Sequence, residues 1–454
     1  MVRESMSIWR AKPVSAAAEV RLHGAIILPN DFISSGTVVV ADGKIKALAR
    51  TREAGSGALE VDTGGIICPG FVDSHNHAAY AVFHRWNPTQ LMKSRFDWRQ
   101  KTRCGVYVVP EPQRHYLDNI KPKFKEFPNA DRHLLFYYGQ LRGLIGGTTT
   151  MVIDAEYDRS IRPMPGFVRD FTDWDTAVEG LLDAGCLMGA ERELVRCRLE
   201  NDQLKLLVHL GEGVDDFSRG ELLSLYENKP SLLHRNTSLI HALALDDDDW
   251  KLVSRFDAGV IWSPRSNVRL YGQTLDIDKV RSLMNTEGRS LRVALAPDWT
   301  VTGSSTLLDE LAHVRQHFPS ISPADLLHMV TDVPADLLGL ATVGRIEVNN
   351  HADLLVFGGA PTNRDEAAEC VVGSGLDNLR LVMVGGLGTY GNERLMSALG
   401  PQAGPEAEPL KVPYKNAPLE RVLRFDSGCK SFKKMRKRLK KGLEQTIAPL
   451  WEPD

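Results

Sequence analysis

Two histidines two positions apart, His75 and His77, follow an apolar run in the segment 69–77, Pro-Gly-Phe-Val-Asp-Ser-His-Asn-His. On an extended strand, residues i and i+2 point to the same side of the backbone. Both imidazoles can therefore face one point, as the ligands of a transition metal must. A His-x-His pair alone is a weak signal, so a metal site requires further ligands from elsewhere in the chain.

Four more apolar runs end in polar side chains that could join such a site. Two of them lead to His209, with Glu212 three residues later, and to His241; the others lead to the segment 263–267 and to Asp298. The carboxyl ends of parallel strands converge on one mouth of a barrel. Each histidine alone would more often be structural, but so many groups on successive strand ends predict one functional site.

The types of these residues indicate the chemistry. His75, His77, His209 and Asp298 offer three imidazoles and one carboxylate. This nitrogen and oxygen set suits Zn²⁺, and Fe²⁺ or Mn²⁺ would also fit. The metal would lower the pKa of a bound water toward neutrality and so produce a hydroxide nucleophile. Asp298 could both contact the metal and accept the proton of that water.

Glu212 and His241 complete the predicted catalytic set. Glu212 could carry the proton of the water to a substrate nitrogen and then to the leaving group, as a general acid–base residue does. His241 could polarise the substrate or hold the water. The alternative is that His241 only orients a neighbouring side chain.

Aromatic and basic side chains crowd the segment 79–130, which predicts long loops with helical pieces over the mouth of the site. Aromatic rings could stack on a planar substrate, and an arginine could pair with a carboxylate. An ordinary surface excursion explains any one of these residues equally well. The candidate substrate contacts, here and beside the strand ends, are Trp86, Arg95, Trp98, Arg265, Asn267 and Trp299.

The elements that position these residues alternate between strand and helix patterns, which predicts βα units and a parallel sheet. Length and alternation favour a (β/α) barrel. An open doubly wound sheet is the alternative, although no Gly-x-Gly-x-x-Gly turn supports a dinucleotide-binding version. Expected strands are 204–209, 237–241, 259–262 and 292–295; expected helices are 133–144, 174–184, 190–199, 220–226, 247–256, 278–285 and 307–318.

Both flanks of the barrel region have β patterns instead. Residues 19–61 indicate short strands with Asp42-Gly43 as a hairpin turn, and residues 344–384 return to β and are expected to pair with them. The tail 429–450 has an apolar stripe at helical spacing beside many lysines and arginines. We expect a helix docked on the body with its basic face in water; a membrane-surface helix is the alternative.

Composition narrows the class of protein. The 454 residues are 43% hydrophobic and 25% charged, which predicts a soluble chain with one large and one smaller domain. The net charge of −3 gives no reason to expect nucleic acid or a membrane as partner. Six scattered cysteines and the lack of a signal-peptide or membrane-spanning run indicate a cytoplasmic protein. A small-molecule substrate and, as the ordinary assembly of such an enzyme, a homodimer are expected.

Together the motifs resemble the amidohydrolase superfamily, most closely the branch with guanine, cytosine and S-adenosylhomocysteine deaminases and the triazine chlorohydrolases. The resemblance covers about residues 20–395 and rests on the segments 69–77, 209–212, 240–242, 263–267, 296–299, 344–347 and 352–356. It implies a distorted (β/α)8 barrel of TIM type with a small β-sandwich built from both chain ends. The implied division is 1–68 and 342–400 for the sandwich, 69–341 for the barrel and 401–454 for a C-terminal extension.

The resemblance also implies a single metal, since dinuclear members bridge two ions with a carbamylated lysine on the fourth strand. Between Thr150 and His209 the one lysine is Lys205, inside the run that leads to His209. In mononuclear deaminases the residues matching Glu212 and His241 shuttle the proton and contact substrate or water. Two features depart from the family: residues 152–204 are short for two full βα units, and 78–110 matches no substrate motif of the guanine, cytosine or adenosyl enzymes.

The expected function is therefore a metal-dependent hydrolase that deaminates an amino-substituted heterocycle or an aromatic amine. The same hydroxide would serve a hydrolytic dehalogenase or a cyclic amide hydrolase, so the motifs leave the leaving group open. A non-catalytic scaffold with the same fold is a remote alternative, because such proteins usually lose ligands and this chain retains the full set.

Overall fold

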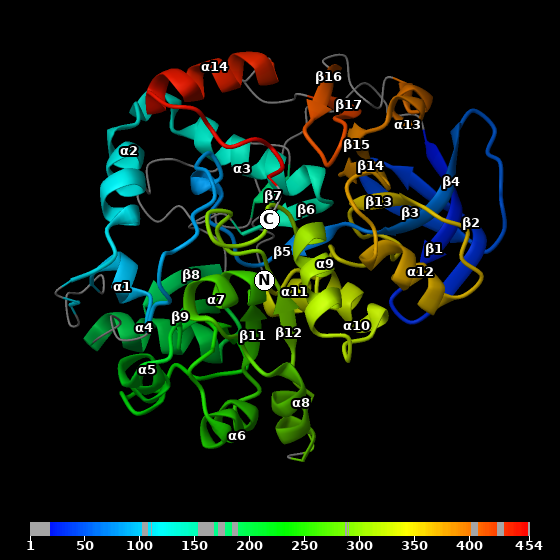
Figure 1. Ribbon diagram of the computed structural model, residues 1–454. Coiled ribbons are helices and arrows are strands. Elements are labelled where there is room, and N and C mark those ends of the chain that lie inside the picture. Colours follow the sequence, from blue (N-terminus) through cyan, green and yellow to red (C-terminus); the bar gives the residue numbers. More distant parts are fainter. Residues whose placement is uncertain are drawn as a thin grey trace.

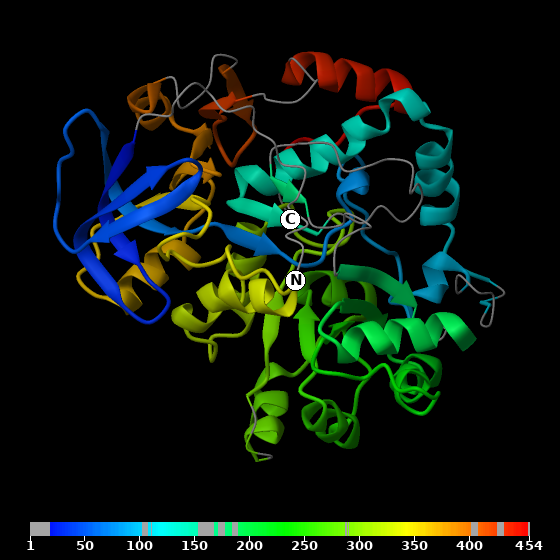
Figure 2. The ribbon, with the colours of Figure 1, turned by 180° about the vertical axis from the view of Figure 1, so that it is seen from behind.

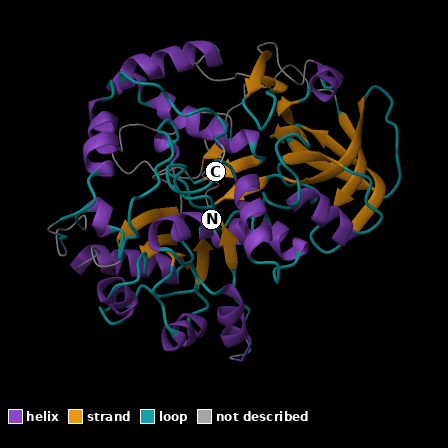
Figure 3. Ribbon diagram, viewed as in Figure 1, coloured by secondary structure: helices purple, strands orange, loops and turns teal. Residues whose placement is uncertain are grey.

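The computed structural model of this protein describes residues 19–101, 108–109, 111–152, 168–170, 178–183, 189–286, 288, 290–400, 407–424 and 431–452. A large β-sheet lies on one side and an α/β unit on the other, with helix α14 running across one edge (Figure 1; from behind in Figure 2). The long strands gather at the sheet side, while helices surround the shorter strands of the α/β unit (Figure 3).

The large sheet joins the two flanks of the chain, as predicted. β13 pairs antiparallel with β4, with Leu354 opposite Pro69. All nine strands belong to one hydrogen-bonded sheet in the described residues, so the expected β-sandwich is not seen as two separate sheets. In sheet order the strands are β16 (Ala407–Val412), β17 (Leu419–Arg424), β15 (Leu387–Gly391), β14 (Leu379–Val384), β13 (Leu354–Gly358), β4 (Leu59–Pro69), β1 (Val20–Ile27), β2 (Phe32–Ala41) and β3 (Lys44–Ala49).

The predicted hairpin turn is present between β2 and β3. Asp42 and Gly43 have φ of 52° and 74°, the left-handed pair that a type I′ turn requires. One face of the sheet is covered by α13 (Glu393–Ala398), whose Leu395 and Met396 pack into the same buried cluster as Val38 and Ile45. The β unit therefore has a hydrophobic core of its own.

The strands that the structure describes in the α/β unit are all parallel and form two sheets. The first holds β5 (Phe71–Asp73), β6 (Thr148–Met151) and β7 (Arg169–Asp170); the second holds β8 (Val178–Asp183), β9 (Lys205–Leu210), β10 (Thr237–His241), β11 (Gly259–Trp262) and β12 (Val293–Leu295). In the described residues the two sheets do not close into one hydrogen-bonded ring. Their inward side chains nevertheless form one buried cluster, made of Val72, Val152, Leu207, Ile240, Ile261 and Ala294 with residues of α11 (Asp332–Leu337).

Helices pack outside these strands and mostly confirm the predicted alternation. The strands and helices expected between residues 204 and 318 are all present, within a few residues of their predicted bounds, whereas residues 344–348, where the return to β was expected to begin, are not in a strand. α7, which follows β11, was not expected. The helices of this unit are α3 (His133–Ile145), α4 (Gly189–Glu200), α5 (Asp216–Tyr226), α6 (Asp247–Arg255), α7 (Pro264–Tyr271), α8 (Ile277–Thr286), α9 (Leu307–His317) and α10 (Pro323–His328), with α12 (Arg364–Val372) between them and the sheet.

The predicted helix at 174–184 is wrong where the structure describes it. Residues 178–183 form strand β8, which pairs parallel with β9, Val178 opposite Lys205 and Asp183 opposite His209. Pairing with a neighbouring strand has overridden a pattern that locally reads as helical. The rest of the predicted helix lies outside the described residues. The span 152–204, which is short for two full βα units, contains one very short strand and one irregular strand: β7 is two residues long, and β8 has a register shift in its pairing with β9.

The excursion after β5 consists of loops with short helical pieces, as predicted. These are η1 (Ala78–Tyr80), α1 (Phe96–Arg99), η2 (Tyr116–Ile120), α2 (Lys121–Glu126) and η3 (Asn129–Asp131). α14 (Phe432–Leu443) is the predicted docked helix: Met435, Leu439 and Leu443 are buried against the body. No helix in the described part of the chain is long and apolar enough to span a membrane.

Candidate metal centre and active site

The His-x-His segment is held in place at the end of β5. The buried carboxylate of Asp73 accepts the backbone N–H of His75 at 3.3 Å and the side-chain N–H of Asn76 at 2.8 Å. Asn76 in turn forms a parallel β-bridge with Asp298, which lies three residues beyond the end of β12. Gly139 of α3 packs so tightly here that an added Cβ would lie 2.2 Å from the backbone oxygen of Ala78. The two histidines therefore leave the strand along a fixed path.

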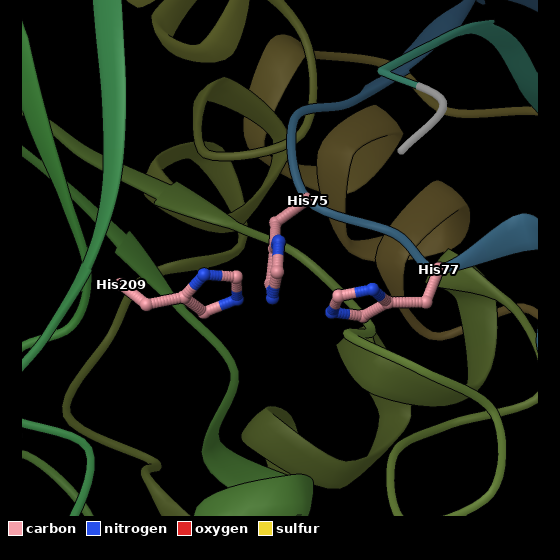
Figure 4. Close-up of side chains that lie close together, drawn as sticks. All are labelled: His75, His77 and His209. Atoms are coloured by element: carbon pink, nitrogen blue, oxygen red, sulfur yellow. The ribbon is translucent and has the colours of Figure 1, made fainter. Parts of the chain in front are cut away.

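Three imidazoles, those of His75, His77 and His209, converge where the sequence predicts them (Figure 4). The ring centroid of His75 lies 5.0 Å from those of both His77 and His209. The Oδ1 atom of Asp298 lies 3.0 Å from His75 Nε2 and 3.5 Å from His77 Nε2. The nearest donor atoms of the three histidines all lie within 4.8 Å of one another, and a second such group, His75 with His241 and Asp298, shares a member with the first. The described residues thus form one candidate centre.

The donor atoms of this centre fit a divalent cation. Both ring nitrogens of His75 and Nδ1 of His209 are buried without a partner of hydrogen-bond geometry, although Asp298 is close to His75. Leaving buried polar atoms unpaired costs free energy, which a shared ligand would relieve. Burial lowers the pKa of His75 to about 4 and that of His209 well below its ordinary value, so both are neutral with free lone pairs.

Asp298 is held ready to act as an anionic donor. Burial alone would raise its pKa, but the close approach of His75 and of the other imidazoles outweighs burial and lowers the pKa. Ser266 on α7 donates to Oδ2 at 2.6 Å, which leaves Oδ1 turned toward the histidines. The backbone of Asp298 has a φ of 59°, and that of His241 a φ of 71°, a left-handed conformation that costs about 1–3 kcal/mol in a non-glycine residue and recurs at functional sites.

Lys205 does not reach the centre. It begins β9, and His209 lies four residues farther along the strand, about 13 Å away at the usual rise per residue. The Nζ atom of Lys205 donates to Asn236 Oδ1 at 2.5 Å. This lysine is therefore not placed to bridge two ions.

The orientation of His241 follows from a chain of hydrogen bonds. Trp262 Nε1 and Asn267 Nδ2 both donate to Thr274 Oγ1, at 2.8 Å and 3.1 Å. The amide of Asn267 must then present its oxygen to Nδ1 of His241, 2.9 Å away. Since Nδ1 is thereby the protonated nitrogen, Nε2 of His241 faces the site with a free lone pair.

Glu212 lies beside His241 and is buried. Its Oε2 is 3.8 Å from His241 Nε2, and its Oε1 accepts a hydrogen bond of 2.7 Å from the hydroxyl of Tyr271. Burial, together with the negative charge of Glu212, raises the pKa of Tyr271 well above its ordinary value, so this hydroxyl remains a donor. Tyr271 was not identified from the sequence, because it ends α7, which was not predicted.

Arg95, an expected substrate contact, is buried and engaged with another side chain of the protein. Its guanidinium forms a two-point ion pair with Glu221 of α5, with Nη1 to Oε2 at 2.9 Å and Nη2 bonded to Oε1. Glu221 also accepts the backbone N–H of Gly211 at 2.8 Å, and the backbone N–H of Arg95 donates to the carbonyl of Glu212 at 3.0 Å. Arg95 therefore supports the loop that carries Glu212.

A pocket opens over these groups. It encloses about 480 Å³, part of it open to solvent, and is lined by His77, Tyr80, Trp98, Arg99, Tyr116, His209, Glu212, His241, Asp298 and Trp299. Two expected substrate contacts, Trp98 and Trp299, are in this lining. Tyr80, Arg99 and Tyr116 also line the pocket but were not among the expected substrate contacts; the position of Tyr80, three residues after His77, was the available signal.

The other expected contacts lie outside the lining. Trp86 stacks on the ring of His115, with centroids 4.9 Å apart. Arg265 donates to the carbonyl of Asp309 at 3.0 Å. Asn267 acts on His241, as described above. Each of these side chains contacts a neighbouring residue of the protein.

Comparisons with known proteins agree with this architecture. A sequence model of the amidohydrolase family matches residues 223–387. A 5-methylthioadenosine/S-adenosylhomocysteine deaminase of Desulforudis audaxviator is 24% identical over 382 residues, which cover 74% of this chain and 84% of the relative.

Two solved structures share the fold. An adenosine deaminase from Xanthomonas campestris with bound zinc has a TM-score of 0.59 at 14% identity, covering 85% of this chain and 96% of that one. A mutant atrazine chlorohydrolase from Arthrobacter aurescens TC1, complexed with zinc and atraton, has a TM-score of 0.57 at 16% identity, covering 82% and 95%. At this identity the likeness shows a TIM-barrel-like α/β fold. The match of residues 223–387 to the amidohydrolase family and the similarity to the deaminase confirm the resemblance of the motifs.

Proposed function

We propose that this chain is a metal-dependent hydrolase that removes an amino group as ammonia from a planar nitrogen heterocycle. The observation that carries the proposal is the position of Glu212, whose carboxylate lies between the tyrosine that holds it and His241, on the wall of the pocket. A carboxylate in this place can exchange a proton with a substrate nitrogen, which hydrolysis of a C–N bond requires. The similarity to deaminases supports the same reaction.

His75, His77, His209 and Asp298 would hold the metal, and zinc is the proposed ion because its ligand preferences match three imidazoles and a carboxylate. When bound, a divalent metal supplies a Lewis acid that lowers the pKa of water toward neutrality. Asp298 Oδ1, which Ser266 leaves available, is placed to receive a proton from the attacking water.

Glu212 would take up one proton of the water and pass it to a ring nitrogen as the water oxygen forms its bond to the carbon that bears the amino group. The second proton of the water, which Asp298 accepts, would pass through Glu212 to the amine, so that the C–N bond breaks and ammonia leaves. Nε2 of His241 would accept a hydrogen bond from the attacking water or from the substrate, in the orientation that Asn267 imposes. The sum of these steps converts water and an aminoheterocycle into the hydroxy or oxo heterocycle and ammonia.

Elemental analysis tests the metal centre first. Purified protein supplied with zinc, iron or manganese should contain about one ion per chain, and His209→Ala should lose most of it. His317→Ala, an exposed histidine on α9, is the matched control and should retain the metal. Wild-type protein that takes up no ion would refute the proposal and favour a non-catalytic scaffold.

A panel of amino- and chloro-substituted heterocycles and cyclic amides then tests the leaving group. Ammonia release that falls by a factor of about 10² to 10⁴ in Glu212→Gln, with metal content unchanged, is the expected result. Release of chloride alone, or full activity in Glu212→Gln, would contradict deamination through Glu212.

We also infer that the parallel strands close into a distorted (β/α)8 barrel over about residues 69–341. The shared cluster of inward side chains and the bridge between Asn76 and Asp298 support closure between β5 and β12. The boundaries of the flanking β unit and of the C-terminal extension remain those predicted from the sequence.

A further inference from the structure

Two loops of the α/β unit each begin with a candidate metal ligand. The histidine loop, residues 77–86, starts at His77 and includes η1. The aspartate loop, residues 298–306, starts at Asp298 and leads into α9. His77 Nε2 and Asp298 Oδ1 lie 3.5 Å apart. The distance between these two ligands therefore depends on how the two loops are held against each other.

The two loops touch each other directly, and both reach the pocket. The backbone N–H of Trp86 in the histidine loop donates to the carbonyl of Val301 in the aspartate loop at 2.8 Å. Tyr80 from the first loop and Trp299 from the second line the pocket, with ring centroids 5.8 Å apart. A shift of one loop against the other would change the pocket wall together with the positions of the ligands.

A buried arginine of α3 joins the loops from inside the protein. Arg142 donates through Nη1 to the carbonyl of Ala81 at 2.8 Å and through Nη2 to the hydroxyl of Ser305 at 2.9 Å. Arg85 also donates to the Ser305 hydroxyl, at 3.4 Å. Two guanidinium groups thus converge on one hydroxyl, and their mutual repulsion requires a negative charge nearby. Burial lowers the pKa of Arg142, and the carboxylate of Glu452 is among the charges that oppose this shift.

This carboxylate comes from the segment 448–452, where the chain turns back from α14 toward the α/β unit (Figure 1). The side chain of Glu452 is 19% exposed. Its Oε2 accepts the backbone N–H of Arg85 at 3.2 Å, and its Oε1 lies 3.2 Å from His84 Nδ1. The backbone oxygen of Glu452 accepts the hydroxyl of Ser305 at 3.1 Å. One residue therefore bonds to the histidine loop and to the aspartate loop.

Two further residues of the segment fasten it to the same part of the protein. The backbone N–H of Ala448 donates to the carbonyl of Val82 in the histidine loop at 2.9 Å. The indole N–H of Trp451 donates to Asp309 Oδ1 at 3.0 Å, in the first turn of α9, just beyond the aspartate loop. The segment thus crosses from one loop to the other and bonds to both sides.

We propose that residues 448–452 form a strap that positions the metal centre, with Glu452 as the residue that fixes the histidine loop against the aspartate loop. This inference rests on the proposed function of the site but assigns a role to a part of the chain that the reaction does not use. Glu452 is a positioning residue, because the described lining of the pocket does not include it and it acts through the two loops.

Cobalt tests the strap without any substrate, since Co²⁺ accepts the same kinds of ligand as zinc and its visible spectrum reports their geometry. In Glu452→Ala of the full chain, the dissociation constant for Co²⁺, measured by competition with a chelator, should rise about 10-fold, the lower end of the range for residues that orient metal ligands. The spectrum of the bound cobalt should change as well. Loss of stability alone would alter neither reading in protein that circular dichroism shows to be folded.

Glu420→Ala is the matched control, since it removes an exposed carboxylate of β17 that pairs with Lys411, and it should leave both readings unchanged. Should Glu452→Ala fail to fold, Glu452→Gln gives the same test. Its amide oxygen can still accept the N–H of Arg85, so the dissociation constant should rise only about threefold, as the loss of a partly exposed charge predicts.

A folded Glu452→Ala, or in its place Glu452→Gln, with the cobalt affinity and spectrum of the wild type would overturn the inference, even if the wild type releases ammonia from its substrate. The proposed function can fail separately. Wild-type protein that binds cobalt but releases no ammonia from any heterocycle of the panel would refute deamination, while weaker cobalt binding in Glu452→Ala would still support the strap.

Discussion

Removing the charge of Arg95 should destabilise the protein strongly, because its ion pair with Glu221 is shielded from solvent. The side chains of the two residues are 1% and 5% exposed. In Arg95→Met, Glu221 would keep the backbone N–H of Gly211 as a partner at 2.8 Å but would lose its two-point contact with the guanidinium. An uncompensated carboxylate in the interior typically costs about 3–5 kcal/mol in the free energy of unfolding.

A double variant separates the effect of charge from that of shape. In the double variant Arg95→Met, Glu221→Gln, neither residue of the pair is charged, and the amide oxygen of Gln at position 221 can still accept the N–H of Gly211. The free energy of unfolding should then fall by only about 1–2 kcal/mol, because only the hydrogen bonds between the two side chains are lost. The double variant should therefore be more stable than Arg95→Met alone, although it carries one more substitution.

Urea denaturation followed by circular dichroism measures both variants, provided that the slope of the transition is unchanged. Arg114→Gln removes an exposed arginine–carboxylate pair of the same excursion and should leave the midpoint in place. Arg95→Met with a loss below about 1 kcal/mol, or a double variant no more stable than the single one, would refute the assignment of Arg95 to a buried supporting ion pair.

Three further predictions concern the surroundings of the site. Gly139→Ala should displace η1, reduce the metal content and lower the free energy of unfolding by about 1–3 kcal/mol, because the added methyl group overpacks this site. Gly220→Ala, on an exposed turn of α5 with open space around it, should raise the free energy of unfolding by roughly 0.5–1 kcal/mol. Thermal unfolding and elemental analysis distinguish the two variants. Tyr271→Phe should lower kcat/KM for ammonia release about 10-fold at unchanged metal content, since Glu212 loses a 2.7 Å hydrogen bond; an unchanged rate would contradict this role. Burial, with nearby cations, lowers the pKa of His313 to about 3, so the unfolded state binds the proton more strongly between that value and about 6.5. Stability should therefore fall as pH decreases from 7 to 5, and melting temperatures should show a smaller fall in His313→Gln.

Local patterns accounted for the residues that converge at the centre. His75 and His77 are separated by two positions next to a strand, and His209, His241 and Asp298 each end or follow an apolar run. His75 and His77 lie just beyond β5 rather than on it, so the two-residue repeat of a strand does not explain their direction. Parallel strands end at a common edge, and this is what brings such groups together.

Local patterns failed where partners come from distant parts of the chain. Arg95 and Arg99 are four residues apart and equally basic, yet one is paired with Glu221 of α5 and the other lines the pocket. Residues 178–183 have a composition that suits a helix, but they form a strand because β9 offers a row of backbone hydrogen-bond partners. No periodicity within either segment contains this information.

By itself, therefore, the sequence determined the types of the site residues and their places at the ends of strands. It also determined the alternation that makes the α/β unit and the amphipathic helix α14. Only the tertiary structure decided that Tyr271 holds Glu212, that Asn267 orients His241, and that Arg99 rather than Arg95 faces the pocket. The physical reason is that secondary structure depends on neighbours a few residues away, whereas hydrogen bonds and ion pairs between side chains depend on which distant segments the packed core brings within about 3 Å of each other.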